Sequence, residues 1–161
     1  MKTLAVFFSK TGNTKKVAEE LIKKLGCDSA ELEYDEKANK ISGGADPSGY
    51  GHVVLLCPIW AFMLADPMKL YLKEHGKSIQ SYSLIVTCGR LGLWGCVKNC
   101  VKATGNKPQH SMKIRSKAVL AGEYDIAPVI SIAGADTGAD TGVDAGADAG
   151  ADAGADTGAE G

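Results

Sequence analysis

Six consecutive residues near the start of the chain combine hydroxyl, amide, ammonium and glycine groups in a pattern that suits a phosphate. They are Ser9, Lys10, Thr11, Gly12, Asn13 and Thr14. Hydroxyls and free backbone N–H groups donate hydrogen bonds to phosphate oxygens, and the positive end of a following helix adds attraction. Gly12 lets the backbone approach closely because it has no Cβ. Ser, Thr and Asn also serve as ordinary helix caps, but four of them within six positions favour a phosphate site.

Other phosphate-binding motifs are missing from the sequence. It contains no G-x-x-x-x-G-K-[ST], and no G-x-G-x-x-G follows the first apolar run. No cysteine has an arginine six positions later, which excludes the phosphatase loop of that spacing. The first apolar run ends at Phe8 and Ser9 without paired acids, which argues against a phosphoacceptor domain.

The elements around this stretch are expected to alternate between strand and helix. Continuous apolar runs predict buried strands, and apolar residues at helical spacing predict amphipathic helices. The expected strands are Leu4–Phe8, Ala30–Tyr34, His52–Cys57 (broken by Pro58), Ser83–Cys88 and Ser116–Ala121, the last with a possible extension over Lys113–Arg115. The expected helices are a first one through Val17–Leu25 that stops at Gly26, a second from about Pro67, and a third over Leu93–Thr104. Residues 36–51 are expected to be mainly loop.

This alternation predicts βαβ units and a parallel sheet. Three informative segments each follow a strand: Ser9–Thr14, Pro58–Asp66 and Gly89–Gly95. Parallel sheets bind ligands beyond the carboxyl ends of their strands, where the strand order reverses. We therefore expect the three segments to meet at one edge of the sheet.

The order and content of these segments resemble the flavodoxin family. The stretch F-F-S-K-T-G-N-T-K-K-V-A is similar to that family's phosphate loop, roughly [ST]-x-T-G-x-T after a buried strand. The stretch V-V-L-L-C-P-I-W-A-F-M-L-A-D-P-M-K-L-Y-L, from Val53 to Leu72, resembles its second flavin loop. The stretch L-I-V-T-C-G-R-L-G, from Leu84 to Gly92, resembles the third. The likeness spans about 120 residues.

The resemblance implies that the chain binds FMN non-covalently and places residues in each part of the site. The phosphate loop would be Ser9–Thr14, and the ring-facing loop would be Pro58, Ile59, Trp60 and Ala61. The loop along the pyrimidine edge would be Thr87, Cys88, Gly89 and Arg90. Trp60 would stack on the ring or meet its edge. Trp94 has two interpretations, a second aromatic wall and core packing.

Arg90, Cys88 and the three histidines each carry a further expectation. A cation at the pyrimidine edge would stabilise an anionic reduced flavin, so Arg90 favours two-electron chemistry, the alternative being a solvated surface arginine. Cys88 is expected to be a small buried residue rather than a redox group. The three histidines at 52, 75 and 110 have no clear catalytic context and are expected at the surface.

The last part of the chain departs from this family pattern. Residues 123–133 contain Pro128 and no helical periodicity, so the usual final helix is expected to be missing or irregular. From Gly134 to Gly161 the sequence is a tetrapeptide array, G-[AV]-[DE]-[TA], repeated seven times. It carries no aromatic residue and is expected to be a disordered tail. The expected organisation is a flavin-binding domain over 1–125, an irregular connection over 126–133 and the tail over 134–161.

Charge is divided between these parts. All 18 Lys and Arg residues lie before residue 118, and 12 of the 19 acids lie within residues 1–133, which gives the body a charge of about +6. The other seven acids give the tail a charge of −7. A basic body could attract an anionic partner, and a tethered acidic tail could screen it or only aid solubility. Five cysteines without C-x-x-C argue against a disulfide framework and a metal cluster, and indicate the reducing cytoplasm.

The fold class expected from all this is α/β, a flavodoxin-like doubly wound five-stranded parallel sheet. The expected function is FMN-dependent electron transfer or oxidoreduction. Two alternatives remain: a flavodoxin-fold binding module without FMN, and an FMN-dependent NAD(P)H:quinone-type reductase. The absence of an NAD(P)H motif leans towards a carrier, whereas Arg90 and the basic body lean the other way. Expected partners are a redox protein, a quinone or NAD(P)H, with no nucleic acid, no metal and no membrane span.

Overall fold

The computed structural model describes residues 2–88 and 92–134. Gly89 and Arg90, and all of the tetrapeptide array after Gly134, lie outside the described residues. The expectations that concern them therefore remain predictions.

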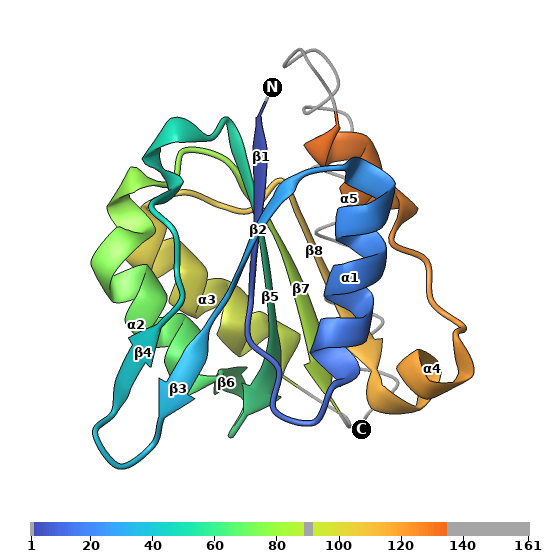
Figure 1. Ribbon diagram of the computed structural model, residues 1–161, viewed down its shortest axis with the longest axis horizontal. Coiled ribbons are helices and arrows are strands. Elements are labelled where there is room, and N and C mark those ends of the chain that lie inside the picture. The colour runs from blue at the N-terminus through green and yellow to red at the C-terminus, as the bar shows by residue number, and fades with distance from the viewer. Residues whose placement is uncertain (1, 89–91, 135–161) are drawn as a thin grey trace.

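Five parallel strands form the central sheet, in the order β2-β1-β5-β7-β8 (Figure 1). Their bounds are β1 Thr3–Phe7, β2 Asp28–Glu31, β5 His52–Trp60, β7 Tyr82–Cys88 and β8 His110–Arg115. The chain first moves from β1 to β2 on one side and then crosses to β5 on the other side of β1. This confirms the expected doubly wound five-stranded sheet.

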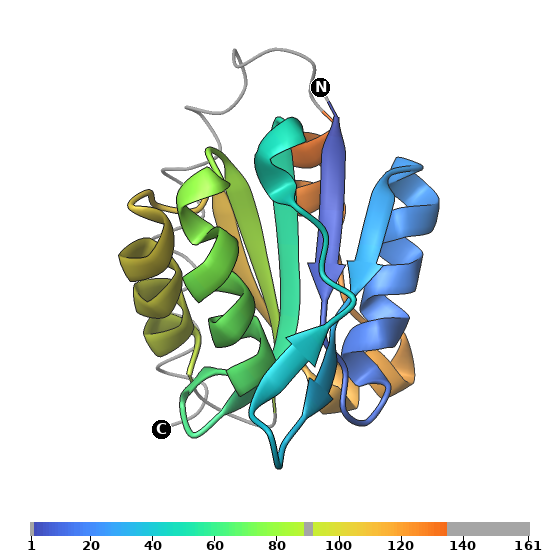
Figure 2. The ribbon, with the colours of Figure 1, turned by 60° about the vertical axis from the view of Figure 1, so that its left-hand side comes forward.

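Helices cover both faces of the sheet (Figures 1 and 2). One face carries α1 (Asn13–Leu25), α4 (Ser116–Ala121) and α5 (Ala127–Ala133). The other carries α2 (Asp66–His75) and α3 (Leu93–Thr104). Two short 3₁₀ turns, η1 (Pro47–Gly49) and η2 (Gly76–Ser78), lie in the connections. Within the described residues, no helix has both the length and the apolar character that crossing a bilayer requires.

Alternation along each strand divides the apolar side chains between two cores. On β1, Leu4 and Val6 belong to the core beneath α2 and α3, whereas Ala5 and Phe7 belong to the core beneath α1, α4 and α5. All four are buried. Burial on both faces explains why the central strands read as unbroken apolar runs in the sequence.

The first difference from expectation concerns residues 30–51. Instead of a single strand over Ala30–Tyr34 and then a loop, the chain forms β2, a break at Leu32, and an antiparallel hairpin of β3 (Glu33–Asp35) and β4 (Lys40–Ser42). Tyr34 pairs with Ile41 across the hairpin. Asn39 takes a left-handed backbone, with φ of 52°, at the turn. Asn tolerates that conformation, which makes the tight turn feasible.

The second difference concerns Pro58, which does not end its strand. β5 continues to Trp60 and then folds back antiparallel as β6 (Met63–Leu64). Pro58 still pairs in register with Thr87 of β7, and its carbonyl accepts a hydrogen bond from the N–H of Ala65 at 3.2 Å. Proline removes one donor but is compatible with extended backbone near a strand end.

The third difference concerns the last elements. The expected fifth strand over Ser116–Ala121 is wrong, because the strand is β8 over His110–Arg115 and the following six residues form α4. The helix ends at Gly122, whose φ of 71° gives a left-handed cap.

The connection over 126–133 is not irregular, since α5 occupies most of it. Pro128 lies in the first turn, where a helix tolerates proline. Val129, Ile132 and Ala133 are spaced so that they bury one face of the helix in the core. The final helix is therefore short rather than missing.

Candidate functional site

The candidate site lies at the carboxyl edge of the sheet, at the point where the chain order reverses between β1 and β5. The loops after these two strands must diverge to opposite faces there, which leaves room for a ligand between them. Strand β7 ends at the same edge, beside β5. In Figure 1 this edge is at the bottom of the molecule, together with the β3–β4 hairpin.

The first loop, Ser9–Gly12, leads directly into the first turn of α1. Gly12 has a φ of 97°, a conformation that side chains oppose, and its N–H donates to Ser9 Oγ at 3.1 Å. Lys10, Thr11 and Gly12 are exposed, and no heavy atom lies within 4 Å of the place where a Gly12 Cβ would be. The first N–H groups of a helix have no partner within it. The loop thus presents donors towards open space.

Thr14 closes the base of this loop against β7. Its Oγ1 lies 2.7 Å from Oγ1 of Thr87, and both side chains are buried. A buried pair of hydroxyls satisfies both groups without water and fixes the start of α1 relative to the end of β7. Two of the predicted site residues, 73 positions apart, are therefore in direct contact.

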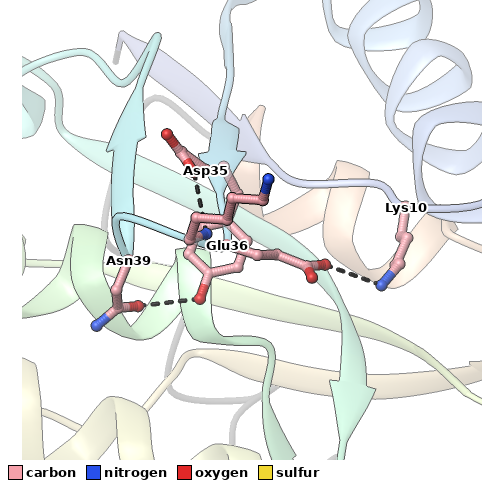
Figure 3. A network of polar contacts seen from close by, with 6 residues as sticks. Lys10, Asp35, Glu36 and Asn39 are labelled. Carbon is pink, nitrogen blue, oxygen red and sulfur yellow. Dashed lines mark hydrogen bonds and ion pairs between the residues drawn. The ribbon is translucent and has the colours of Figure 1, made fainter.

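Lys10 connects the first loop to the β3–β4 hairpin and to the second loop. Its Nζ lies 3.0 Å from Oε1 of Glu36 (Figure 3) and 5.3 Å from the ring centre of Trp60. The hairpin turn that holds Glu36 is itself braced, because Asp35 accepts the N–H of Lys37 and Tyr34 donates to Asn39. Both members of the ion pair are more than half exposed, so the pair orients the loop more than it stabilises the fold.

Next to this ion pair, the rings of Phe8, Tyr34 and Trp60 form an aromatic cluster. Trp60 lies at an interplanar angle of 88° to Phe8, with ring centres 5.7 Å apart, and Tyr34 lies 6.2 Å from Trp60. Edge-to-face contacts of this kind hold the rings in defined orientations. Trp60 is half-buried in this arrangement.

The second loop contains the only strained non-glycine pair among the described residues. Ala61 and Phe62 have φ angles of 51° and 66°. The left-handed conformation costs roughly 1–2 kcal/mol for a residue with a Cβ. Phe62 is also 64% exposed, so no burial of its side chain repays that cost. Strain of this kind concentrates at binding and catalytic sites.

Close packing against α3 holds the second loop in place. A Cβ on Gly95 would lie 2.2 Å from the carbonyl oxygen of Phe62, and a Cβ on Gly92 would lie 2.8 Å from the side chain of Ile59. Asn99 Oδ1 accepts the N–H of Leu64 at 3.2 Å. Only glycine permits this approach at the start of α3, so the second loop and the start of α3 pack as one unit.

The predicted site residues are thus brought together where the structure describes them. Contacts join the first loop to β7 through Thr14, the first loop to the second through Lys10 and Trp60, and the second loop to the start of α3 through Gly92. Pro58 and Ile59 are half-buried in the second loop, and Ala61 is exposed. Gly89 and Arg90 lie outside the described residues.

Cysteine and histidine side chains take no visible part in the site. Burial raises the pKa of the thiols of Cys57, Cys96 and Cys100 well above their usual range, which keeps these thiols protonated. Cys88 is buried at the end of β7, as expected for a packing residue. The expectation that the histidines are at the surface is wrong for His52 and His110, which are buried. Trp94, by contrast, is 69% exposed, which excludes core packing.

Three residues of the candidate site were not predicted from the sequence: Tyr34, Glu36 and Phe62. Tyr34 and Glu36 enter through the hairpin. Tyr34 was expected at the end of a single strand, and Glu36 at the start of a loop. The alternation Glu33-Tyr34-Asp35 before a turn-forming Asn39 was the available signal. Phe62 had no such signal, because its left-handed backbone depends on packing against Gly95.

Comparison with known proteins places this arrangement among flavoproteins at the level of the fold. No family model and no curated sequence matches the chain. A flavoprotein in complex with FMN from Lactobacillus acidophilus superposes with a TM-score of 0.59 and 19% identity, covering 75% of this chain and 97% of that one. A flavodoxin, WrbA-like protein from Agrobacterium tumefaciens gives 0.60 and 14%, with coverages of 82% and 98%. A flavodoxin from the domain Archaea gives 0.50 and 15%, with coverages of 81% and 99%. The strand order, the two helical layers and these likenesses agree: the chain has the flavodoxin-like α/β fold.

Proposed function

We propose that the protein binds FMN at the carboxyl edge of its sheet and serves as a flavodoxin-like electron-transfer protein or oxidoreductase. The observation that carries the proposal is the convergence of the polar Ser9–Thr14 loop with Trp60 at the point where strand order reverses. The FMN bound by the Lactobacillus acidophilus flavoprotein, which has the same fold, supports the choice of ligand.

The donor set of the first loop fits a phosphate. It offers exposed Thr11 and Gly12, half-buried Ser9 and Asn13, and the N-terminus of the 13-residue helix α1. The open space beside Gly12 means that no protein atom fills the place a ligand would take there. Thr14 supports this loop from below through Thr87 rather than facing outwards.

The second loop fits a flat aromatic ligand. Trp60 keeps an exposed part while Phe8 and Tyr34 fix its orientation, and Pro58 and Ile59 flank it. Thr87 and Cys88, with Gly89 and Arg90 beyond them, would line the remaining edge. FMN supplies the redox chemistry when bound, and the chain contributes orientation, exclusion of water and local charge.

The first test is a titration of the purified full chain with FMN, followed by flavin and tryptophan fluorescence. We expect saturable quenching, and visible flavin bands that survive desalting. Reduction with dithionite then shows whether electrons enter in two resolved one-electron steps or in one two-electron step. Oxidation of NAD(P)H by the loaded protein would favour the reductase over the carrier.

A matched pair of glycine variants makes the test specific to the site. Gly12→Ala and Gly122→Ala both place a Cβ on a left-handed backbone with open space around it. Both should cost about 1 kcal/mol of stability, but only Gly12→Ala should weaken FMN binding, by tenfold or more. A chain that neither quenches nor retains FMN would contradict the proposal and leave the binding module without flavin.

A further inference from the structure

Charge in the body of the protein is separated along the chain. Between Glu74 and Glu123 there are 48 residues and not one Asp or Glu. The same stretch contains eight basic residues: Lys77, Arg90, Lys98, Lys102, Lys107, Lys113, Arg115 and Lys117. By contrast, six of the twelve acids of the body lie between Asp28 and Asp46.

The fold turns this separation into two sides of one molecule. The acid-free stretch forms β7, α3, β8 and α4, and β8 is one edge of the sheet. The acid-rich stretch forms β2, which is the opposite edge of the sheet, and the β3–β4 hairpin, which lies in front of the sheet in Figure 2. The side that contains β8 and α3 is therefore strongly basic.

On α3 the basic residues line up with an aromatic residue. Trp94, Lys98 and Lys102 are spaced four apart, which places them on one face of the helix, and all three are exposed. Lys98 Nζ lies 4.1 Å from the ring centre of Trp94. The ion pairs between described residues involve neither Lys98 nor Lys102. We call these three residues the α3 stripe.

The α3 stripe begins at the candidate site. The main chain of Phe62 contacts α3 at Gly95, the neighbour of Trp94, and Asn99 Nδ2 lies 3.7 Å from Met63 Sδ. Phe62 and Met63 are 64% and 45% exposed. These are two of the four large apolar side chains exposed among the described residues, and Trp94 is a third. Apolar contact area and positive charge thus adjoin the loop that holds Trp60.

We propose that the α3 stripe, with Phe62 and Met63, is the docking surface for an acidic protein that exchanges electrons with the bound flavin. The inference rests on the proposed function for its purpose, but the surface itself does not need the flavin. A central apolar and aromatic patch with a charged rim is the usual composition of a protein interface. An electron-transfer partner needs close approach to the site, and complementary charge would steer it there.

Charge complementarity selects the acidic occupant. A two-fold dimer through this face would set the basic stripe of one copy against the basic stripe of the other. A nucleic acid would need bases stacked on an open ring, whereas Lys98 already lies over Trp94. The chain's own acidic array begins after Gly134, at the amino edge of the sheet, where Ala133 accepts a hydrogen bond from Thr3. It therefore starts at the edge opposite the candidate site, where the α3 stripe begins.

The experiment measures binding of the full chain to an oxidised plant-type ferredoxin, an acidic protein, by calorimetry in 20–200 mM salt. It is run with and without added FMN. We expect a dissociation constant that rises at least tenfold over this salt range, and binding that persists without FMN. Because the readout is binding, loss of FMN affinity alone would overturn the proposed function and leave the docking surface standing.

The decisive comparison is between two double variants of equal charge. Lys98→Glu with Lys102→Glu should weaken ferredoxin binding at least tenfold at 20 mM salt. The control, Lys23→Glu with Lys73→Glu, changes α1 and α2 at exposed positions and should weaken it less than threefold. Trp94→Ala, measured without added FMN, should weaken ferredoxin binding several-fold.

Five outcomes would overturn the inference. No binding at 20 mM salt would mean that the stripe does not dock the acidic protein. Equal loss in both double variants would leave only a net-charge effect. A single-stranded oligonucleotide that binds more tightly than ferredoxin, and loses affinity in the Lys98→Glu, Lys102→Glu variant, would assign the stripe to nucleic acid. A dimer in gel filtration that this variant dissociates would assign it to a second copy. Binding seen only after the seven acids beyond Gly134 are changed to amides would assign it to the chain's own array.

Discussion

The amino edge and the carboxyl edge of the sheet use polar and aromatic residues in opposite ways. At the amino edge, His52 is buried between two serines, with Nδ1 2.8 Å from Ser81 Oγ and Nε2 2.9 Å from Ser83 Oγ. At the carboxyl edge, Ala61 and Phe62 keep a strained backbone and the Phe62 ring is exposed. At the amino edge, side-chain hydroxyls satisfy both ring nitrogens of His52, while the carboxyl edge holds conformations that only its packing maintains.

The difference indicates which edge of the sheet can accept a loss of stability. A ligand site needs open donors and fixed loops, both of which lower stability. The closed amino edge and the two cores offset that cost. Changes at the two edges should therefore separate: one edge should govern the stability of the fold, and the other the affinity for FMN.

The largest expected effect is on the amino edge and depends on pH. Burial lowers the pKa of His52 from 6.5 to about 4, so the unfolded chain takes up a proton before the folded one does. The stabilisation of the fold by neutral His52 is fully present above pH 6.5. As pH falls towards 4 this stabilisation is lost, and the free energy of unfolding decreases by about 3 kcal/mol. Urea unfolding between pH 4 and 7.5 measures it.

Carboxylates also titrate in the lower part of that range, so the comparison is between the parent protein and a variant. His52→Gln should flatten the profile between pH 4.5 and 6.5. Parallel profiles for the parent protein and this variant would contradict the role given to His52.

At the carboxyl edge the largest effect is expected from Gly95→Ala. The new Cβ would lie 2.2 Å from the backbone oxygen of Phe62, so the second loop has to move. We expect a loss of about 2 kcal/mol of stability and a weakening of FMN binding by at least tenfold. Gly49→Ala is the control, because nothing lies within 4 Å of its Cβ position. Fluorescence titration and urea unfolding of both variants check this.

A double-mutant cycle on Thr14 and Thr87 tests the contact that joins the first loop to β7. Thr14→Val or Thr87→Val alone leaves a buried hydroxyl unpaired and should cost 1–2 kcal/mol, about as much as the double change. The coupling free energy should therefore be about 1 kcal/mol by urea unfolding. Additive losses would show that the hydroxyls do not interact in solution.

The smallest effect should have the opposite sign. Ala61→Gly relieves a left-handed backbone with φ of 51° and should raise the free energy of unfolding by about 0.5 kcal/mol. Because the loop becomes less fixed, FMN affinity should fall a few-fold. The same change at Ala121, an exposed helical residue, should lower stability instead. A gain at both positions would mean that strain at Ala61 is not the cause.

The sequence predicts the parts of the fold that depend on local pattern. The central strands, α1 with its glycine stop and α3 over Leu93–Thr104 follow from apolar runs, helical spacing and caps. The convergence of Ser9–Thr14 with Trp60 follows from parallel topology, because loops after parallel strands share an edge.

What the sequence did not predict depends on pairing between distant segments. Residues 110–112 contain no apolar run and become strand because β7 offers a partner for them. Ser116–Ala121 contain good helix formers, and without a strand partner they take the helix. The Tyr34–Trp60 contact requires a hairpin whose two arms are too short to be recognised singly.

The hydrogen bond from Thr3 Oγ1 to the carbonyl of Ala133, at 2.7 Å, holds the first strand and the last helix side by side. A domain whose first strand and last helix lie side by side behaves topologically as a ring that has been cut once. The cut could be moved: a short linker from Ala133 to Thr3, with new ends opened in the hairpin turn between Asp35 and Lys40, would leave every parallel strand pair intact. Such a circular permutant would release the turn that Glu36 ties to Lys10 without changing any amino acid in it.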